Sequence, residues 1–147
     1  MTKIRKAMDS DAESAINTLR RSISELCVAD HDGDPQEIES WLSNKTVEAW
    51  SKWIASDGAT VFVADRNQMV VGVGMVSLQG EIMLNYVHPD ARFSGVSKAI
   101  LAAMEEELRS HNISSCHLES TATAQEFYEN YGFQRDKADA LIMSKTL

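Results

Sequence analysis

An arginine, a glycine and small residues follow a hydrophobic segment directly in the stretch YVHPDARFSGVSKAIL. A helix that begins near Gly95 leaves its first backbone N–H groups without intrahelical partners, and such a row of donors can bind an anion. Gly95 tolerates a positive φ, Ser97 keeps the groove open, and Arg92 and Lys98 add positive charge. The spacing R-x-x-G-x-S therefore indicates a phosphate site on the N–H groups of residues 94–98.

The spacing disfavours two other phosphate loops. A Walker loop needs G-x-x-x-x-G-K-[ST], and a dinucleotide-binding loop needs G-x-G-x-x-G after a first strand. Neither occurs here, so a domain that binds ATP or NAD is disfavoured. A plain helix N-terminus with an exposed arginine would show the same short motif. The motif alone therefore does not distinguish a phosphate site from an ordinary helix start, and other segments of the chain are needed to choose between them.

The elements that must position this loop follow from hydrophobic periodicity. Gly72 and Gly74 in a predicted strand indicate either a bend or the close approach of a neighbouring element. Short turns join three of the strands into an antiparallel meander. The expected elements, in order, are a strand at 3–8, a helix at 9–26, a polar loop to Asp34, helices N-capped by Asp34 and Thr46, strands at 60–65, 69–78 and 81–88, a helix from Val96, a strand at 113–120, a helix ending near Gly132 and a strand at 140–147.

Two of these helices carry expectations about individual faces. The helix from Val96 has one apolar stripe for the sheet, with Glu105 and Glu106 on its solvated face. In the helix after Thr46, Val47 shares an apolar face with Trp50 and Trp53. Together with Trp41 of the preceding helix, these tryptophans predict a pair of helices packed over a sheet, although one tryptophan could also line a pocket.

Composition excludes several classes of function. A length of 147 residues, 44% of them hydrophobic, predicts a single domain, 1–147, with a core of its own. The net charge of −8 argues against nucleic acid as the main partner. No apolar run approaches the roughly 20 residues that span a bilayer, and the N-terminus lacks a signal-peptide core, so we expect a cytoplasmic protein without a membrane partner. Cys27 and Cys116 lack metal-ligand spacing and are expected to be buried free thiols, with no metal bound.

A second segment, STATAQEFYENYGFQ, gives the phosphate loop its context. The two stretches together resemble the GNAT superfamily of acetyl-CoA-dependent N-acetyltransferases. In that family a Q/R-x-x-G-x-G/A loop opens the helix after the fourth strand, and an A-x-x-F-Y-x-x-x-G-F segment lies after the fifth. Here the two motifs are Arg92 to Ser97 and Ala124 to Phe133. The resemblance implies an α/β (α+β) fold, with a mixed, mostly antiparallel sheet of about six to seven strands, flanked by helices and splayed between strands 4 and 5.

The resemblance also implies acetyl-CoA as the co-substrate. Its pyrophosphate would lie on the N–H groups of residues 93–98, and its pantetheine arm would enter the gap between the splayed strands. An N–H near Val87 would polarise the thioester carbonyl, and Tyr128 would act as the general acid that protonates the departing thiolate. Tyr131 lacks the match and is expected to pack. The implied cofactor contacts are Tyr86, Val87, His88, Arg92, Phe93, Ser94, Gly95, Val96, Ser97, Lys98, Thr121 and Tyr128.

Transfer to an amine also needs a base, because the nucleophile must be neutral. Glu81 stands where some relatives carry a carboxylate base, and strand alternation places it on one face with Asn85, although an exposed strand-end glutamate fits equally well. Asp30, His31 and Asp32 lie in a loop that helps form the acceptor pocket in the family, where they could bind an ammonium group or act as the base in place of Glu81 or water; a plain surface loop is the alternative. Candidate substrate contacts are therefore Asp30, His31 and Asn85.

The expected function is transfer of an acetyl group from acetyl-CoA directly to a primary amine of a small molecule or protein. The alternative is a catalytically inactive acyl-CoA-binding sensor or regulatory module with the same fold. An exposed final strand could support a homodimer.

Overall fold

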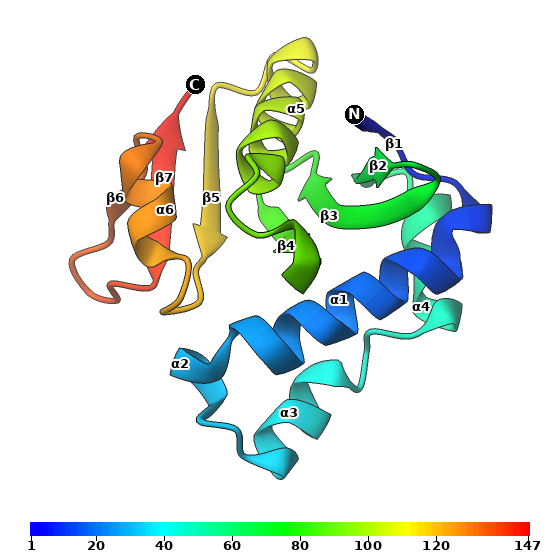
Figure 1. The fold of residues 1–147 in the computed structure, drawn as a ribbon. Helices are drawn as coiled ribbons and strands as arrows, with labels where there is room; N and C mark the ends of the chain where they lie inside the picture. The colour runs from blue at the N-terminus through cyan, green and yellow to red at the C-terminus, as the bar shows by residue number, and fades with distance from the viewer.

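The computed structural model describes residues 1–147 as two β-sheets with helices packed on them (Figure 1). The strands are β1 (Thr2–Lys6), β2 (Ala59–Arg66), β3 (Met69–Ser77), β4 (Ile82–Val87), β5 (Ser115–Glu119), β6 (Gln134–Arg135) and β7 (Ile142–Thr146). The helices are α1 (Ala12–Leu26), α2 (Val28–His31), α3 (Pro35–Leu42), α4 (Val47–Ala55), α5 (Val96–Ser110) and α6 (Gln125–Asn130), with short 3-10 turns at Asp9–Asp11 and Pro89–Ala91. None of the helices is long and apolar enough to cross a bilayer.

The two sheets are joined by backbone pairing at one point and then separate. One has the strand order β1-β2-β3-β4 and the other β5-β7-β6, and all their pairings are antiparallel. A single parallel bridge joins Glu81 to His117, where the His117 N–H donates to the Gly80 carbonyl at 2.9 Å. Beyond this bridge β4 and β5 do not pair. The predicted fold class, including the splay between strands 4 and 5, is confirmed.

A bulge in β4 accompanies the separation. Val76 pairs with Ile82 and Met75 with Leu84, so Met83 has no partner on β3. An extra residue of this kind bends its strand and increases the local twist. The bulge lies near the bridge at Glu81, at the start of the segment that leaves β5.

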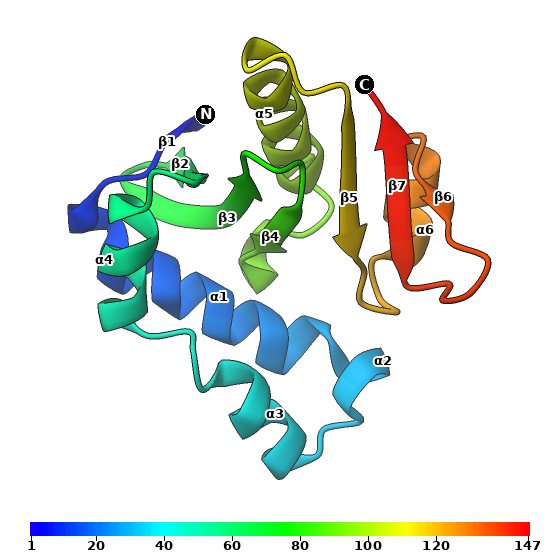
Figure 2. The same ribbon diagram turned by 180° about the vertical axis from the view of Figure 1, so that it is seen from behind.

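Helices cover both faces of the four-stranded sheet (Figures 1 and 2). Alternate β2 side chains join different core clusters: Val61 and Val63 pack with α1 and α4, whereas Phe62 and Ala64 pack with α5. Gly74 has no side chain because α5 lies directly over it, and a Cβ atom there would meet the Ile100 side chain. The glycines of β3 therefore reflect close approach rather than a bend, and this packing fixes where α5 begins relative to the end of β4.

Most of the expected helix signals are confirmed. Asp34 accepts a hydrogen bond from the Gln36 N–H at 3.0 Å, and Thr46 Oγ1 accepts one from the Ala49 N–H at 3.1 Å, so both residues cap the predicted helices. Trp50 is fully buried and packs against the sheet. Cys27 and Cys116 are buried free thiols.

Other expectations were wrong. The short helix α2 replaces part of the predicted polar loop, and Val47 is exposed. Glu105 is buried rather than solvated, because its carboxylate pairs with Lys145 Nζ at 3.0 Å. The final strand β7 is not a free edge, since it lies between β5 and β6, with Gln134 of β6 opposite Ser144. A homodimer formed by strand pairing through β7 could therefore use only those residues of β7 that do not pair with β6.

Candidate active site

A row of unpaired backbone donors marks the start of α5. None of the N–H groups from Arg92 to Lys98 donates a hydrogen bond within the protein. Gly95 is the N-cap residue with φ +80°, and a Cβ atom there would meet nothing within 4 Å, so its backbone conformation rather than packing favours glycine. The helix has no side-chain cap. These donors, at the positive end of the α5 dipole, suit an anionic ligand.

The loop that carries these donors is held in place by neighbouring side chains. Arg66 Nη2 donates to Ser94 Oγ at 3.2 Å, and Ser94 Oγ donates to the Ala91 carbonyl at 2.5 Å. Arg92 and Lys98 are exposed on the same loop and first helical turn. Three cationic side chains therefore gather at the unpaired N–H groups of a chain whose net charge is −8.

A cavity of about 510 Å³ opens beside this loop. Phe127 of α6 and Tyr131, the C-cap residue of this helix, form one wall, with ring centroids 4.9 Å apart, and Leu26 at the end of α1 contributes as well. None of these three residues is among those that the sequence predicts for the site. The motif spacing marks Tyr131 only as a packing residue, and its place in the cavity wall depends on where the end of α6 lies relative to the first turn of α5. The lining is Leu26, Val87, Ala91, Arg92, Phe93, Gly95, Val96, Ser97, Lys98, Phe127 and Tyr131.

The edge of β4 that faces β5 offers further backbone groups. The His88 N–H donates to the Val71 carbonyl on β3 at 2.8 Å. Because bonded and non-bonded pairs alternate along an antiparallel ladder, the backbone groups of Val87 and Asn85 point the other way, toward β5. Since β4 and β5 pair only at Glu81, these groups are free to bind an extended ligand.

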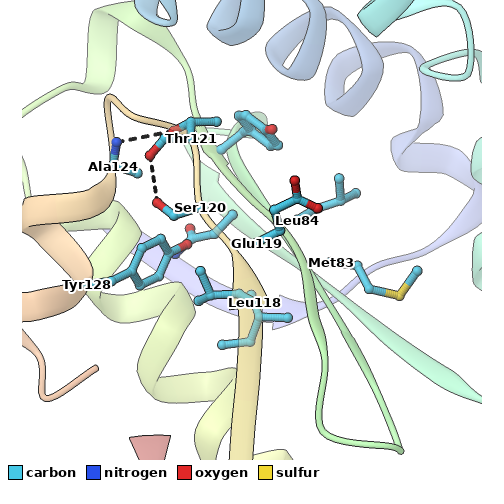
Figure 3. Close-up of a pocket in the computed structure, with 11 residues that line it drawn as sticks. Met83, Leu84, Leu118, Glu119, Ser120, Thr121, Ala124 and Tyr128 are labelled. Carbon is cyan, nitrogen blue, oxygen red and sulfur yellow. Dashed lines mark hydrogen bonds between the residues drawn. The ribbon is translucent and has the colours of Figure 1, made fainter. Parts of the chain in front are cut away.

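Tyr128 lies at the inner end of this gap. It is 6% exposed, and Figure 3 shows its ring extending from α6 toward Leu118 and Ser120 of the β5 segment. Burial raises the pKa of the Tyr128 phenol to about 12, and hydrogen bonding by Asn85 acts in the opposite direction. The phenol therefore stays protonated at neutral pH and can donate a proton.

Asn85 connects the parts of the site. Its Nδ2 donates to the Ser97 carbonyl in the first turn of α5 at 3.4 Å, while its Oδ1 is buried without a hydrogen-bond partner. Asn85 and Tyr128 line a small cavity of about 50 Å³ between β4 and β5. An unpaired buried acceptor is costly unless a ligand supplies a donor, so this atom is a candidate contact for a bound molecule.

A third cavity, of about 480 Å³, shares Tyr86 and Thr121 with the small one. Two exposed carboxylates, Glu81 and Glu119, line it, and neither takes part in an ion pair or a side-chain hydrogen bond. Trp41 also lines this cavity, so one tryptophan does contribute to a pocket. The sequence offered no signal for Glu119, because a glutamate on an alternating strand reads only as a solvated residue.

Two polar residues of the predicted acceptor loop are engaged within the protein. Asp30 accepts hydrogen bonds from the Ala122 N–H at 2.5 Å and from Thr123 Oγ1 at 2.7 Å, so it ties α2 to the segment before α6. His31 is 3% exposed, with Nε2 bonded to the Ile23 carbonyl and Nδ1 accepting from Gly33. Asp30 still lines the third cavity, whereas His31 has no free ring nitrogen for a ligand.

The remaining candidates have structural partners. His88 is buried and its Nδ1 accepts from the Asp90 N–H at 3.0 Å, capping the turn that follows β4. Thr121 Oγ1 accepts from the Ala124 N–H at 3.1 Å at the start of α6. Burial raises the pKa of Tyr86, which lies between the small cavity and the third one. No cluster of three His, Cys, Asp or Glu side chains is arranged to hold a metal ion.

Comparison with solved structures shows a shared fold. The PaiA N-acetyltransferase of Thermoplasma acidophilum, in complex with coenzyme A, superposes with a TM-score of 0.87 at 21% identity, over 100% of this chain and 99% of that one. A GCN5-related N-acetyltransferase of Rhodopseudomonas palustris gives 0.85 at 20% identity, over 100% and 96%. The ribosomal-protein-S18-alanine N-acetyltransferase of Escherichia coli gives 0.66 at 18% identity, over 99% and 94%.

Family assignment comes from the sequence itself. A search of curated proteins found no match. The family model described as "Acetyltransferase (GNAT) domain" matches residues 29–141, a segment that includes β4, the unpaired N–H row, α5 and Tyr128. Since this match covers most of the chain and the fold agrees with it, the protein belongs to the GNAT acetyltransferase family.

Proposed function

We propose that this protein, acting as a single domain, transfers an acetyl group from acetyl-CoA directly to a primary amine. The observation that carries the proposal is the continuity from the unpaired N–H groups of residues 92–98, through the free edge of β4, to the buried phenol of Tyr128. Acetyl-CoA has matching parts in the same order, a pyrophosphate, an extended amide-bearing arm and a thioester.

The residues present fit this co-substrate. The N–H row, with Arg92 and Lys98, would bind the pyrophosphate, and the missing Cβ of Gly95 leaves room for phosphate oxygens to reach the backbone. The amides of the pantetheine arm would pair with the outward backbone groups of Asn85 and Val87, as a peptide adds to a sheet edge. Asn85 Oδ1, buried and unpaired, would accept a hydrogen bond from the same arm.

Polarisation of the thioester would come from the backbone of β4. The Val87 N–H, directed into the gap, would donate to the carbonyl oxygen and then to the oxyanion that forms when the amine nitrogen attacks. A donor aimed at developing charge contributes most when it is fixed in advance, and the ladder with β3 fixes this one.

Proton transfer would then complete the reaction. As the carbon–sulfur bond breaks, Tyr128 would donate its phenolic proton to the departing thiolate sulfur. The attacking amine must lose a proton as well, and we propose that Glu81 accepts it, directly or through water, from the third cavity. Glu119 lines the same cavity and is the competing candidate for this role.

Acceptor binding is proposed at this third cavity, on the far side of Tyr86 from the phosphate loop. Glu81 and Glu119 would attract a cationic amine, and Trp41 and Tyr86 would contact its carbon chain. Asp30 would act at the cavity wall mainly by holding the segment before α6, because its carboxylate is already hydrogen-bonded there.

A panel of small amines and peptides with free N-termini, incubated with acetyl-CoA, would test the proposal. We expect thiol release that depends on the amine, with acetylated product identified by mass. Glu81→Gln and Glu119→Gln, compared in parallel, would identify the base. The variant that lacks the base should show the larger fall in kcat, and this fall should be largest at low pH, because there the amine is protonated. Saturable coenzyme A binding without turnover on any acceptor would contradict catalysis and favour an acyl-CoA sensor.

A further inference from the structure

One large aromatic side chain at the phosphate loop has no packing role. Phe93 is 93% exposed, far more than any other aromatic residue of the protein, and its backbone has φ +60°. A bulky residue rarely adopts this left-handed conformation, which costs free energy. An exposed phenyl ring in a strained position gives the isolated chain no evident stabilisation.

The surroundings of Phe93 limit what it could bind. The Arg92 guanidinium lies 4.6 Å from the centroid of the ring, so the ring already carries a cation on one face. Phe93 lines the 510 Å³ cavity together with Lys98. The Arg66 guanidinium is also close, because it donates a hydrogen bond to Ser94, the residue after Phe93. A ligand at this place should therefore combine a flat, electron-rich ring with negative charge.

The orientation expected for acetyl-CoA in the site identifies one such ligand. If the acyl end lies inward beside Tyr128 and the pyrophosphate lies on the N–H row, the remaining end of the molecule must leave the cavity outward past the loop. That end is an adenine nucleotide with a further phosphate on its ribose. Phe93 lies where the cavity opens to solvent, beside cationic side chains that would suit this phosphate.

We propose that Phe93, with Arg92 stacked on it, is the platform on which the adenine ring of the co-substrate stacks, and that Arg92 and Arg66 attract the ribose phosphate. This inference rests on the proposed function and deepens it. Stacking on an aromatic side chain accepts any base, so the platform adds affinity for the nucleotide end without contributing to the chemistry.

Two donors separate this role from a general effect on the fold. Acetyl-CoA carries the nucleotide, and acetyl-pantetheine does not. Phe93→Ala should raise KM for acetyl-CoA by roughly 5- to 150-fold, the range expected for one stacked base, and should leave KM for acetyl-pantetheine and kcat for both donors unchanged. Phe93→Trp should keep KM for acetyl-CoA close to the wild-type value. The matched control is Val47→Ala, which shortens an exposed apolar side chain away from the loop, on α4, and should leave both KM values unchanged.

Binding measured without turnover keeps the two proposals distinguishable. Adenosine 3′,5′-bisphosphate, titrated by calorimetry, should bind the wild type and lose affinity in Phe93→Ala by a similar factor. Phe93→Gly should bind it as weakly as Phe93→Ala while unfolding at a higher denaturant concentration, since glycine relieves the positive φ. If the bisphosphate binds in this manner but no amine is acetylated, the platform stands and the proposed enzymatic function fails.

Other results would overturn the inference. Equal rises in KM for both donors would mean that Phe93 only supports the loop. Unchanged KM values, with self-association in the wild type that Phe93→Ala abolishes, would mean that a second copy of the chain covers the ring.

Discussion

Replacing Tyr128 by phenylalanine removes one oxygen atom and keeps the buried ring. If the phenol protonates the leaving thiolate, kcat should fall by about 10²- to 10⁴-fold, the usual contribution of a positioned acid. KM for acetyl-CoA should stay within about twofold, because neither the N–H row nor the edge of β4 involves the hydroxyl group. Stopped assays with a thiol reagent, and calorimetry with coenzyme A as the control for binding, measure both quantities.

The pH dependence sharpens this prediction. Burial raises the pKa of Tyr128 to about 12, so at pH 9 only about one phenol in a thousand is ionised. The wild-type rate should therefore show no loss that is due to this group between pH 7 and 10. A Tyr128→Phe variant with kcat within threefold of the wild type at every pH, or a wild-type rate that declines with a tyrosine-like titration below pH 10, would refute the assignment.

Three further predictions concern the frame that holds the site. Gly74→Ala should lower the free energy of unfolding by about 1–3 kcal/mol in urea titrations, because the new methyl group meets Ile100 of α5; an unchanged midpoint would contradict the packing. Asp30→Ala should lower kcat by loosening the segment before α6, and Thr123→Ala added to it should cost little more; additive losses would mean that the two residues act separately. Burial raises the pKa of the Cys116 thiol to about 11, so the folded state holds this proton more tightly than the unfolded chain does. Stability from this group is fully present below about pH 9 and is lost as the pH rises through about 11, with a slope of up to about 1.4 kcal/mol per pH unit that Cys116→Ala should remove.

The order of the elements other than α2 and β6 could be predicted from the sequence, because each of these carries a local signal. Asp34 and Thr46 cap helices, alternation gives the meander, and Gly95 begins α5. The glycines in β3 predicted a bend or a close approach, and only the position of α5 over Gly74 decides between these alternatives.

Two of the expectations that were wrong depend on pairing that local patterns do not reveal. Glu105 looks like a solvated helical residue until Lys145, forty positions away, is placed beside it. The two-residue strand β6 is too short to give a periodic signal, although it pairs with the nearby β7 and makes β7 an inner strand.

The candidate site divides along the same line. The unpaired N–H row and Tyr128 belong to contiguous motifs; the spacing indicated the first as an anion site, and the resemblance to the GNAT family implied the role of the second. Glu119 and Phe127 line cavities only because β4 and β5 separate and because the fold places α6 across a cavity from the start of α5. The internal bonding of His31 could not be foreseen, because its partners Ile23 and Gly33 become neighbours through the short turn of α2.

Backbone amide spectra recorded during a coenzyme A titration would show directly whether the cofactor lies along the start of α5 and the edge of β4. We expect the largest NMR shift changes at the amides of residues 93–98 and at Asn85 and Val87, with little change around Ser115 and Thr146 in the groove on the outer face of the β5-β7-β6 sheet. Shift changes that leave the start of α5 and the edge of β4 unaffected would mean that coenzyme A does not bind there.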